Sequence, residues 1–270
     1  KKPYNISLGI SLSEYPLIKH LISILRLSDQ YVNGNVETEI LKKVTTSPYI
    51  SGAISEQNNR ALINNKILQL PKTKIKNNEI ISFCKDCPLL KEIFLKLNRV
   101  KFSKKITLEQ SLDLMNSFML IWGFTSDRNL SSSEYLVYEK YQVESLVLNK
   151  LSNFHNLNTF SDTLKILIAH LNAVIFQPQS GPANIHILGS LEAEGLFFDF
   201  AWVTSMTSSF LPGKIKMPLF IPPKTSIENS LPGTSFELIT KESKSTLKNL
   251  QNLSKNLIFS YSTTSDSREQ

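Results

Sequence analysis

The sequence predicts an α/β fold, in which a parallel sheet domain is built from both ends of the chain and is interrupted by a large all-helical insertion. Apolar residues alternate as in strands near both ends, whereas between them they recur mostly at helical spacing. Strands that alternate with helices indicate a parallel sheet. We therefore predict one domain over residues 1–36 plus 181–270 and a helical insertion domain over residues 37–180.

The first 36 residues have the pattern of a strand followed by a helix. Ile6, Leu8 and Ile10 alternate along the predicted strand, and apolar residues then recur at helical spacing between Leu17 and Leu25. An Asn-Gly-Asn sequence at 33–35 is typical of a turn and ends this unit.

The middle of the chain has mainly helical periodicity. Helices are predicted near residues 36–46, 55–68, 87–98, 107–122, 132–152 and 160–174. Thr107 and Gln110 have the spacing of a capping box, and Ser161 is the expected N-cap of the last of these helices.

After Ser180-Gly181-Pro182 the period changes to that of strands. The predicted elements are strands at 184–189 and 198–205, a loop rich in Pro, Ser and Lys at 206–234, a helix at 235–253 and a strand at 256–261. This alternation supplies the second half of the α/β domain.

Composition limits the class of protein. The 270 residues are 41% hydrophobic, and no apolar run reaches the roughly 18 residues of a membrane span. The start of the chain has neither a signal-peptide pattern nor an initiator Met, so we expect an excised segment of a cytoplasmic protein with no membrane contact. Two cysteines give no reason to expect a disulfide-built secreted domain.

The charge balance favours a polyanionic partner. Thirty Lys and Arg residues against 23 Asp and Glu give a formal net charge of +7, which would attract a nucleic acid through steering and counterion release. The alternative is that a Lys-, Asn- and Ile-rich composition gives only a solvated surface. The net charge alone does not distinguish a nucleic-acid-binding surface from a solvated one.

A CxxC motif, formed by Cys84 and Cys87, could hold half of a zinc site or cycle as a dithiol. The chain has no second cysteine pair, and its four histidines are scattered without ligand spacing. We therefore expect no metal site, and interpret Cys87-Pro88 as the start of a helix.

Two basic segments of the helical region could contact DNA. Lys101, Lys104 and Lys105 lie in a run of cations that also contains Phe94 and Phe102, and Arg128 follows Trp122 at a helix end. Cations could follow a phosphate backbone while an aromatic ring stacks on a base. The competing interpretation is a solvated lysine run, with Phe94 and Trp122 in the core.

A second set of candidates follows the strands of the carboxyl-terminal part. Lys214 and Lys216 lie beside Gly213 after the predicted strand 198–205, on the side where parallel sheets place ligands. Ser190, after the first of these strands, could hydrogen-bond a phosphate. His186 is expected to fill its strand face, and the lysine loop could equally be merely basic.

The segment from Ile185 to Pro212, IHILGSLEAEGLFFDFAWVTSMTSSFLP, resembles the fifth conserved motif of UvrD/Rep/RecB-type helicases. Gly195, with Ala193, Leu196 and Phe198, keeps the frame of that motif. Glu194 stands where these helicases have Lys, and Phe197 stands where they have a Glu near the nucleotide ribose. The frame is kept and the polar contacts are replaced.

Two more segments resemble helicase motifs in the same order. Residues 3–27 resemble the fourth motif, and Tyr15, before Pro16, stands where active relatives carry an Arg that reaches the phosphates. Residues 247–261 resemble the sixth motif, and Asn252 stands where the Arg that stabilises the transferring phosphoryl group is expected. The resemblance implies that ATP chemistry is lost at all three motifs.

The amino-acid sequence resembles the degenerate, inactivated helicase region of bacterial AddB/RecC-like helicase-nuclease repair proteins, notably in the segments LSEYPL and LIFSYS. This resemblance implies a RecA-like second motor domain with a helical insertion. It also implies no cofactor and no catalytic residue in this segment. ATP and a divalent metal would be bound only by helicase or exonuclease domains of the parent protein outside it, and no phosphate-loop motif occurs here.

The leading hypothesis is a non-catalytic, helicase-like segment that holds single-stranded or forked DNA in repair or recombination, beside a helicase or nuclease partner subunit. One alternative is a protein-interaction scaffold whose helical insertion docks a partner subunit. Another is a working half of an ATP-dependent DNA motor with diverged nucleotide contacts.

Overall fold

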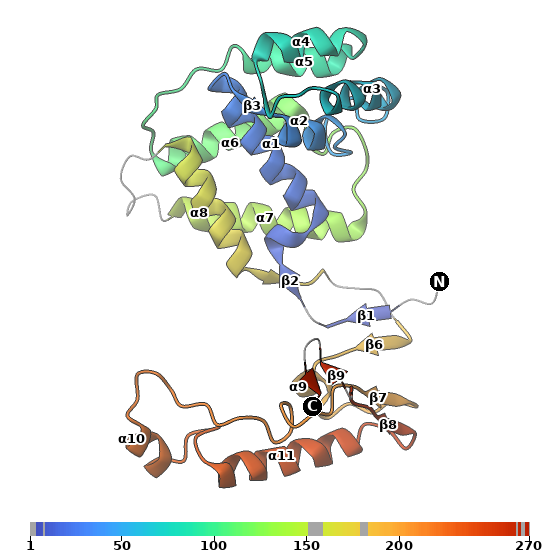
Figure 1. The fold of residues 1–270 in the computed structure, drawn as a ribbon, viewed down its shortest axis with the longest axis vertical. Coiled ribbons are helices and arrows are strands. Elements are labelled where there is room, and N and C mark those ends of the chain that lie inside the picture. Colours follow the sequence, from blue (N-terminus) through green and yellow to red (C-terminus); the bar gives the residue numbers. More distant parts are fainter. Residues whose placement is uncertain are drawn as a thin grey trace. The chain divides into compact units, whose positions relative to one another are not determined.

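A computed structural model of the chain describes residues 4–7, 9–150, 159–178, 183–262, 264–265 and 268–269. The chain divides into two compact units (Figure 1). We call Gly9–Ala183 the helical unit, and Lys1–Leu8 with Asn184–Gln270 the α/β unit.

The helical unit contains most of the helices of the described chain (Figure 1). Its helices are the 3₁₀ turn η1 (Leu12–Glu14), α1 (Pro16–Val32), α2 (Thr38–Thr45), α3 (Gln57–Leu68), α4 (Asn77–Phe83), the 3₁₀ turn η2 (Cys84–Asp86), α5 (Pro88–Leu97), α6 (Leu108–Trp122), α7 (Ser132–Lys150) and α8 (Phe160–Ala173). Two short antiparallel pairs join β2 (Ile10–Ser11) to β5 (Ile175–Phe176) and β3 (Val36–Glu37) to β4 (Lys74–Ile75).

Helix α1 is the centre of the helical unit. It packs against α2, α6, α7 and α8, and its side chains from Leu17 to Tyr31 are buried on most of its circumference. A helix that is apolar on most sides is stable only when other helices surround it. Pro16 occupies the first helical position, where its missing N–H costs nothing.

Helix α6 begins and ends as its sequence predicts. The Thr107 hydroxyl accepts from the Gln110 N–H at 3.1 Å, and the Gln110 side chain accepts from the Thr107 N–H at 3.0 Å, which completes the capping box. Gly123 ends the helix in the left-handed conformation with φ +56°.

The α/β unit combines parallel strand pairs with helices. Its elements are β1 (Tyr4–Ile6), β6 (Ile185–Ile187), α9 (Ser190–Ala193), β7 (Ala201–Val203), α10 (Pro223–Glu228), α11 (Phe236–Gln251), β8 (Leu257–Phe259), β9 (Thr264–Ser265) and β10 (Arg268–Glu269). Strands β1 and β6 pair in parallel, as do β7 and β8, while β9 and β10 pair antiparallel. The mixed α/β class and parallel pairing are confirmed.

The strands of the α/β unit do not form one continuous sheet among the described residues. Each is in a two-stranded sheet, whereas the sequence predicted a single parallel sheet. The buried core of this unit consists of Ala193, Leu250 and Leu253, with partly buried neighbours such as Val203. By contrast, a continuous cluster of buried side chains runs through the helical unit.

The boundary between the two units differs from the predicted domains. Residues 9–36, including all of α1, were predicted in the α/β domain and belong to the helical unit. The reason is that the apolar surface of α1 is covered by other helices. The predicted N-cap Ser161 is also wrong, because Thr159 accepts from the Asp162 N–H at 3.2 Å and caps α8.

Most predicted elements are confirmed with shifted ends. Residues 36–37 are strand rather than helix, α4 was not predicted, and the loop 206–234 contains the short helix α10. Leu8, residues 180–182 at the expected change of period and residues 151–152 at the end of the helix predicted over 132–152 lie outside the described residues.

Candidate functional site

The turn after β6 is occupied by a carboxylate. Glu192 accepts a hydrogen bond from the Gly189 N–H at 2.7 Å and another from the Ser7 hydroxyl. These bonds, the Ser7 bond first, lower the pKa of Glu192 below its ordinary value, so that it stays ionised. A negative charge therefore lies on α9, within the segment that resembles the fifth helicase motif.

Three candidate positions follow this turn, and none of them carries a cation that could bind a nucleotide phosphate. Gly195 adopts φ +82°, a left-handed conformation that favours glycine, and Glu194 precedes it as the C-cap of α9. The Phe197 side chain is 67% exposed. An exposed phenyl ring cannot hydrogen-bond a ribose hydroxyl, as the Glu of the resembled motif would.

Asn252 ends helix α11. Its backbone N–H donates to the carbonyls of Lys248 and Asn249, and the residue is exposed. An amide side chain carries no charge, so it cannot stabilise a transferring phosphoryl group as an Arg would. Asn252 and the Glu194–Phe197 positions belong to the α/β unit, whereas Tyr15 belongs to the helical unit.

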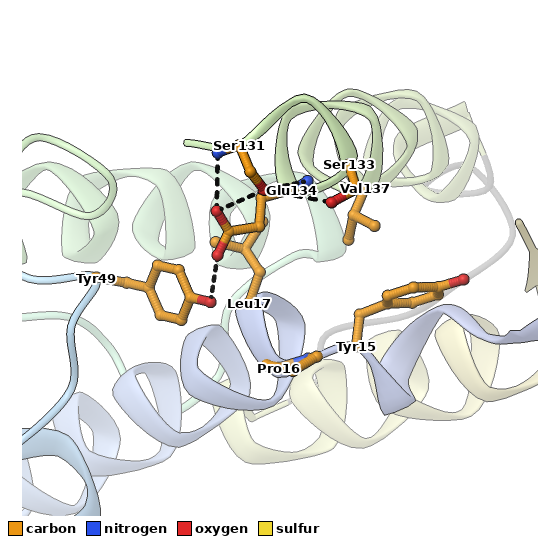
Figure 2. A pocket seen from close by; sticks show the side chains of 8 residues that line it. All are labelled: Tyr15, Pro16, Leu17, Tyr49, Ser131, Ser133, Glu134 and Val137. Carbon is orange, nitrogen blue, oxygen red and sulfur yellow. Dashed lines mark hydrogen bonds between the residues drawn. The ribbon is translucent and has the colours of Figure 1, made fainter. Parts of the chain in front are cut away.

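Tyr15 lines a cavity of about 330 Å³ in the helical unit, at the start of α1 (Figure 2). Its hydroxyl donates to the Phe176 carbonyl at 2.8 Å, and its ring packs edge-on against the Phe176 ring. The cavity is also lined by Pro16, Leu17, Tyr49, Ser131, Ser133, Glu134 and Val137. Tyr15 thus ties α1 to the strand after α8.

Glu134 gives this cavity a negative charge. Figure 2 shows its carboxylate between Tyr49 and the start of α7; it accepts from the Tyr49 hydroxyl at 2.7 Å and from the Ser131 N–H at 2.9 Å. Arg128 completes an ion pair with Glu134 and lies over the Tyr49 ring. Burial opposes ionisation, but these bonds lower the pKa of Glu134 to about 2. The carboxylate that lines the cavity is therefore already held by Arg128, Tyr49 and Ser131.

Three of the candidate DNA-binding cations lie together in one loop. Lys101, Lys104 and Lys105 are exposed between α5 and α6. Phe102 anchors this loop, since its ring contacts the Phe160 ring with centroids 5.9 Å apart. None of the three lysines is ion-paired with another described residue, so their ammonium groups can meet a phosphate.

Arg128 is separate from this loop and is already engaged. It follows α6, whereas the three lysines precede it, and 15 residues at about 1.5 Å each separate the helix ends by roughly 22 Å. Its guanidinium is committed to Glu134 and Tyr49. The aromatic residues Phe94 and Trp122 are fully buried, as the core interpretation predicted.

The remaining candidates lie in the α/β unit. Lys214 and Lys216 are exposed in the loop between β7 and α10, and neither is ion-paired within the described part of the chain. Ser190 is half-buried at the start of α9 and lines a groove of about 930 Å³. The two lysines do not line that groove, so Ser190 and the cations form no single site.

Both cysteines are free and buried. Burial, with the neighbouring Cys87, raises the pKa of the Cys84 thiol to about 12. A protonated thiol is neither a good nucleophile nor a metal ligand. Pro88 begins α5 directly after Cys87, as the sequence predicted.

Sequence reasoning missed the polar cluster around Glu134. Its signal was present, because Ser131 and Glu134 have the Ser-x-x-Glu spacing of a capping box before a helix. It also missed the groove of the α/β unit. The run from Phe197 to Val203 has the pattern of a strand buried on both faces, and no periodicity could show that several of its side chains are exposed.

Comparisons with known proteins identify no family. No protein-family model matches the chain, and no curated protein matches it significantly. Within the described residues, no helix is long and apolar enough to cross a membrane, and no group of three or more His, Cys, Asp or Glu side chains could hold a metal ion.

Proposed function

We propose that this chain is a non-catalytic, helicase-like segment of a bacterial DNA repair or recombination helicase-nuclease, and that it holds single-stranded or forked DNA. The proposed frame is RecA-like, with the helical unit as its insertion. The observation that carries the proposal is the parallel pairing of β1 with β6, which joins the chain start to the segment resembling the fifth helicase motif.

The residues at the nucleotide positions support a role without ATP hydrolysis. Phe197 is an exposed apolar ring, and Asn252 is a neutral helix end. Beside these positions, Glu192 places a carboxylate on α9. Phosphoryl transfer depends on cations that stabilise charge on the phosphates. We expect no DNA-stimulated ATP hydrolysis that depends on Tyr15 or Asn252, and such hydrolysis would overturn the proposal.

The exposed lysines support DNA contact. Lys101, Lys104 and Lys105 in one loop, and Lys214 with Lys216 in another, are cations without an ion-pair partner among the described residues. Phosphate neutralisation by such side chains releases counterions and makes affinity fall with salt, by about 0.7 log units per log unit of salt for each single-strand contact.

The test is a fluorescence-anisotropy titration with single-stranded, duplex and forked DNA at two salt concentrations. Charge reversal at Lys104→Glu with Lys105→Glu, or at Lys214→Glu with Lys216→Glu, should weaken binding and flatten the salt dependence. A matched control is Lys241→Glu with Lys248→Glu on the exposed side of α11. Equal losses in all three doubles would indicate general charge attraction, and no binding at low salt would contradict the DNA role.

A further inference from the structure

The groove of the α/β unit lies between two strands that are each paired on one side only. It has a volume of about 930 Å³ and is lined by residues of β6 and β7, with Leu250 and Leu253 near the end of α11. Among the described residues, β6 pairs with β1 alone and β7 pairs with β8 alone. Each strand therefore has one edge whose backbone groups have no ladder partner.

Both strands also expose apolar side chains beside the groove. Ile185 and Ile187 of β6 are 45% and 53% exposed, and Trp202 of β7 is 65% exposed. Parallel strands are ordinarily covered on both faces and read as apolar runs for that reason. An open edge combined with exposed apolar side chains is the arrangement that accepts an additional strand.

The chemistry of the lining selects the kind of occupant. None of the residues that line the groove is Lys, Arg, Asp or Glu; its polar members are Asn184, His186, Ser190, Thr204, Ser205, Thr207 and Ser209. A nucleic-acid backbone would leave its phosphates without cations there. An uncharged, extended polypeptide would satisfy both strand edges and cover the apolar side chains.

One exposed aromatic side chain at this groove, that of Trp202, is held in place by a hydrogen bond. The Trp202 indole N–H donates to the Ser260 hydroxyl at 2.8 Å, which fixes the ring while it remains exposed. Phe200, on the same chain segment, is 59% exposed and also lines the groove. Rigid, exposed aromatic side chains are typical of the anchor positions of protein interfaces.

We propose that this groove is a strand-acceptor site, into which a partner protein inserts an extended segment with apolar side chains at alternate positions. The inserted segment pairs with the open edges of β6 and β7 and converts two strand pairs into one sheet. This site is separate from the lysine loops proposed to hold DNA, so either proposal can fail without the other.

The experiment uses the full chain and four fluorescein-labelled octapeptides that alternate Val, Ile, Leu or Phe with Thr. At least one should bind in an anisotropy titration and slow amide hydrogen exchange in 185–187 and 201–203. Its counterpart with Pro at every Thr position should bind at least tenfold more weakly, because proline has no N–H to donate to a strand edge.

Substitutions test the location. Phe200→Asp places a charge in the groove and should weaken peptide binding at least tenfold, as should Trp202→Ala. The control Phe220→Asp changes a side chain that is 97% exposed and does not line the groove, and it should leave binding unchanged. Circular dichroism checks that each variant is folded.

Three results would overturn the proposal. One is that none of the four peptides binds, and another is that the proline peptides bind as well as their parents. The third is competition for the groove by an oligothymidylate or by a second copy of the chain, detected as displacement of the peptide or as a dimer that Phe200→Asp abolishes. Loss of DNA binding in the lysine variants with peptide binding retained would leave this proposal intact.

Discussion

At the scale of single residues, the hydrogen bond between Trp122 and Ser28 joins the two central helices of the helical unit. The Trp122 indole N–H donates to the Ser28 hydroxyl at 2.8 Å, and both side chains are fully buried. We expect Ser28→Ala to lower the free energy of unfolding by about 1–3 kcal/mol, because it leaves a buried donor without an acceptor. Urea denaturation measures this change.

Ser117→Ala is the matched control for this prediction. Like Ser28, Ser117 donates to the carbonyl four residues earlier, but it is exposed and accepts from no buried indole. The control should leave the urea midpoint close to that of the wild type. If both variants lose equal stability, the Trp122 bond contributes nothing beyond the serine itself.

Glu134 gives the helical unit an acid-sensitive contact. Although burial opposes its ionisation, hydrogen bonds from Ser131, Tyr49 and Arg128 lower its pKa from 4.5 to about 2. A lowered pKa in the folded state contributes stability above pH 4.5, and this contribution is lost as the pH falls from 4.5 toward 2. Glu134→Gln should therefore reduce the loss of thermal stability across that window.

Tyr49→Phe refines the pH prediction. It removes one of the donors to the Glu134 carboxylate, so the pKa of Glu134 should rise toward 4.5. The loss of stability should still begin near pH 4.5, but it should end at a higher pH than in the wild type and should be smaller. Melting temperatures measured from pH 2 to 7 test both variants. A wild-type acid profile in Glu134→Gln would show that other groups cause the acid sensitivity.

At the scale of elements, a buried ion pair holds α3 against the start of α5. Arg60 donates to Glu56 at 2.8 Å, and the same carboxylate accepts from the N–H groups of Leu89 and Leu90. Arg60→Met leaves a buried carboxylate without its cation and should cost about 3–5 kcal/mol. Chemical denaturation measures the loss.

The exposed pair Lys96–Glu92 is the control for the buried pair. It has the same spacing of four residues on α5, but its side chains are 51% and 57% exposed. Lys96→Met should leave the denaturation midpoint nearly unchanged, because water screens an exposed pair. A comparable loss in both variants would mean that burial of the Arg60 pair has no special effect.

At the scale of the whole molecule, the two units differ in how much apolar surface they bury. The core of the helical unit extends from α1 through α8, whereas Ala193, Leu250 and Leu253 form that of the α/β unit. Segments with few buried apolar contacts open more easily. Hydrogen exchange should therefore be faster in β6, β7 and β8 than in α1 and α6.

Mass spectrometry of peptides from each unit tests this difference. The exchange rates of amides in Ile185–Ile187 and Leu257–Phe259 should exceed those in the middle of α1 by at least tenfold. Equal protection would contradict the difference in core size. Addition of a bound octapeptide should slow exchange in β6 and β7 but not in α1.

The sequence predicted the elements better than their grouping. Periodicity located α3, α6 and α11 within a few residues, because local side-chain spacing reports which face of a helix is apolar. It did not find α4, which has only seven residues. It also assigned α1 to the α/β domain, because the apolar spacing of a helix does not show whether a sheet or other helices cover it.

The candidate site was predictable only as residue types. The sequence identified the exposed lysines as cations, and Lys101, Lys104 and Lys105 do lie together in one loop. It could not show that Arg128 is committed to Glu134 or that Ser190 lines an uncharged groove. The Arg128–Glu134 ion pair and the lining of the groove both depend on how separate elements pack together. The spacing of residues along one element does not show such contacts.

By itself, the sequence determined the mixed α/β class, the parallel direction of the β1–β6 and β7–β8 pairs, the Thr107 capping box and the start of α5 at Pro88. These depend on local periodicity and on backbone groups within one turn. Only the tertiary structure decided that α1 belongs to the helical unit, that Glu134 is held ionised and that β6 and β7 each have an edge unpaired by any described strand. Those features depend on contacts between elements. Burial of apolar side chains places α1, whereas hydrogen bonds and an ion pair hold Glu134 ionised against the effect of burial.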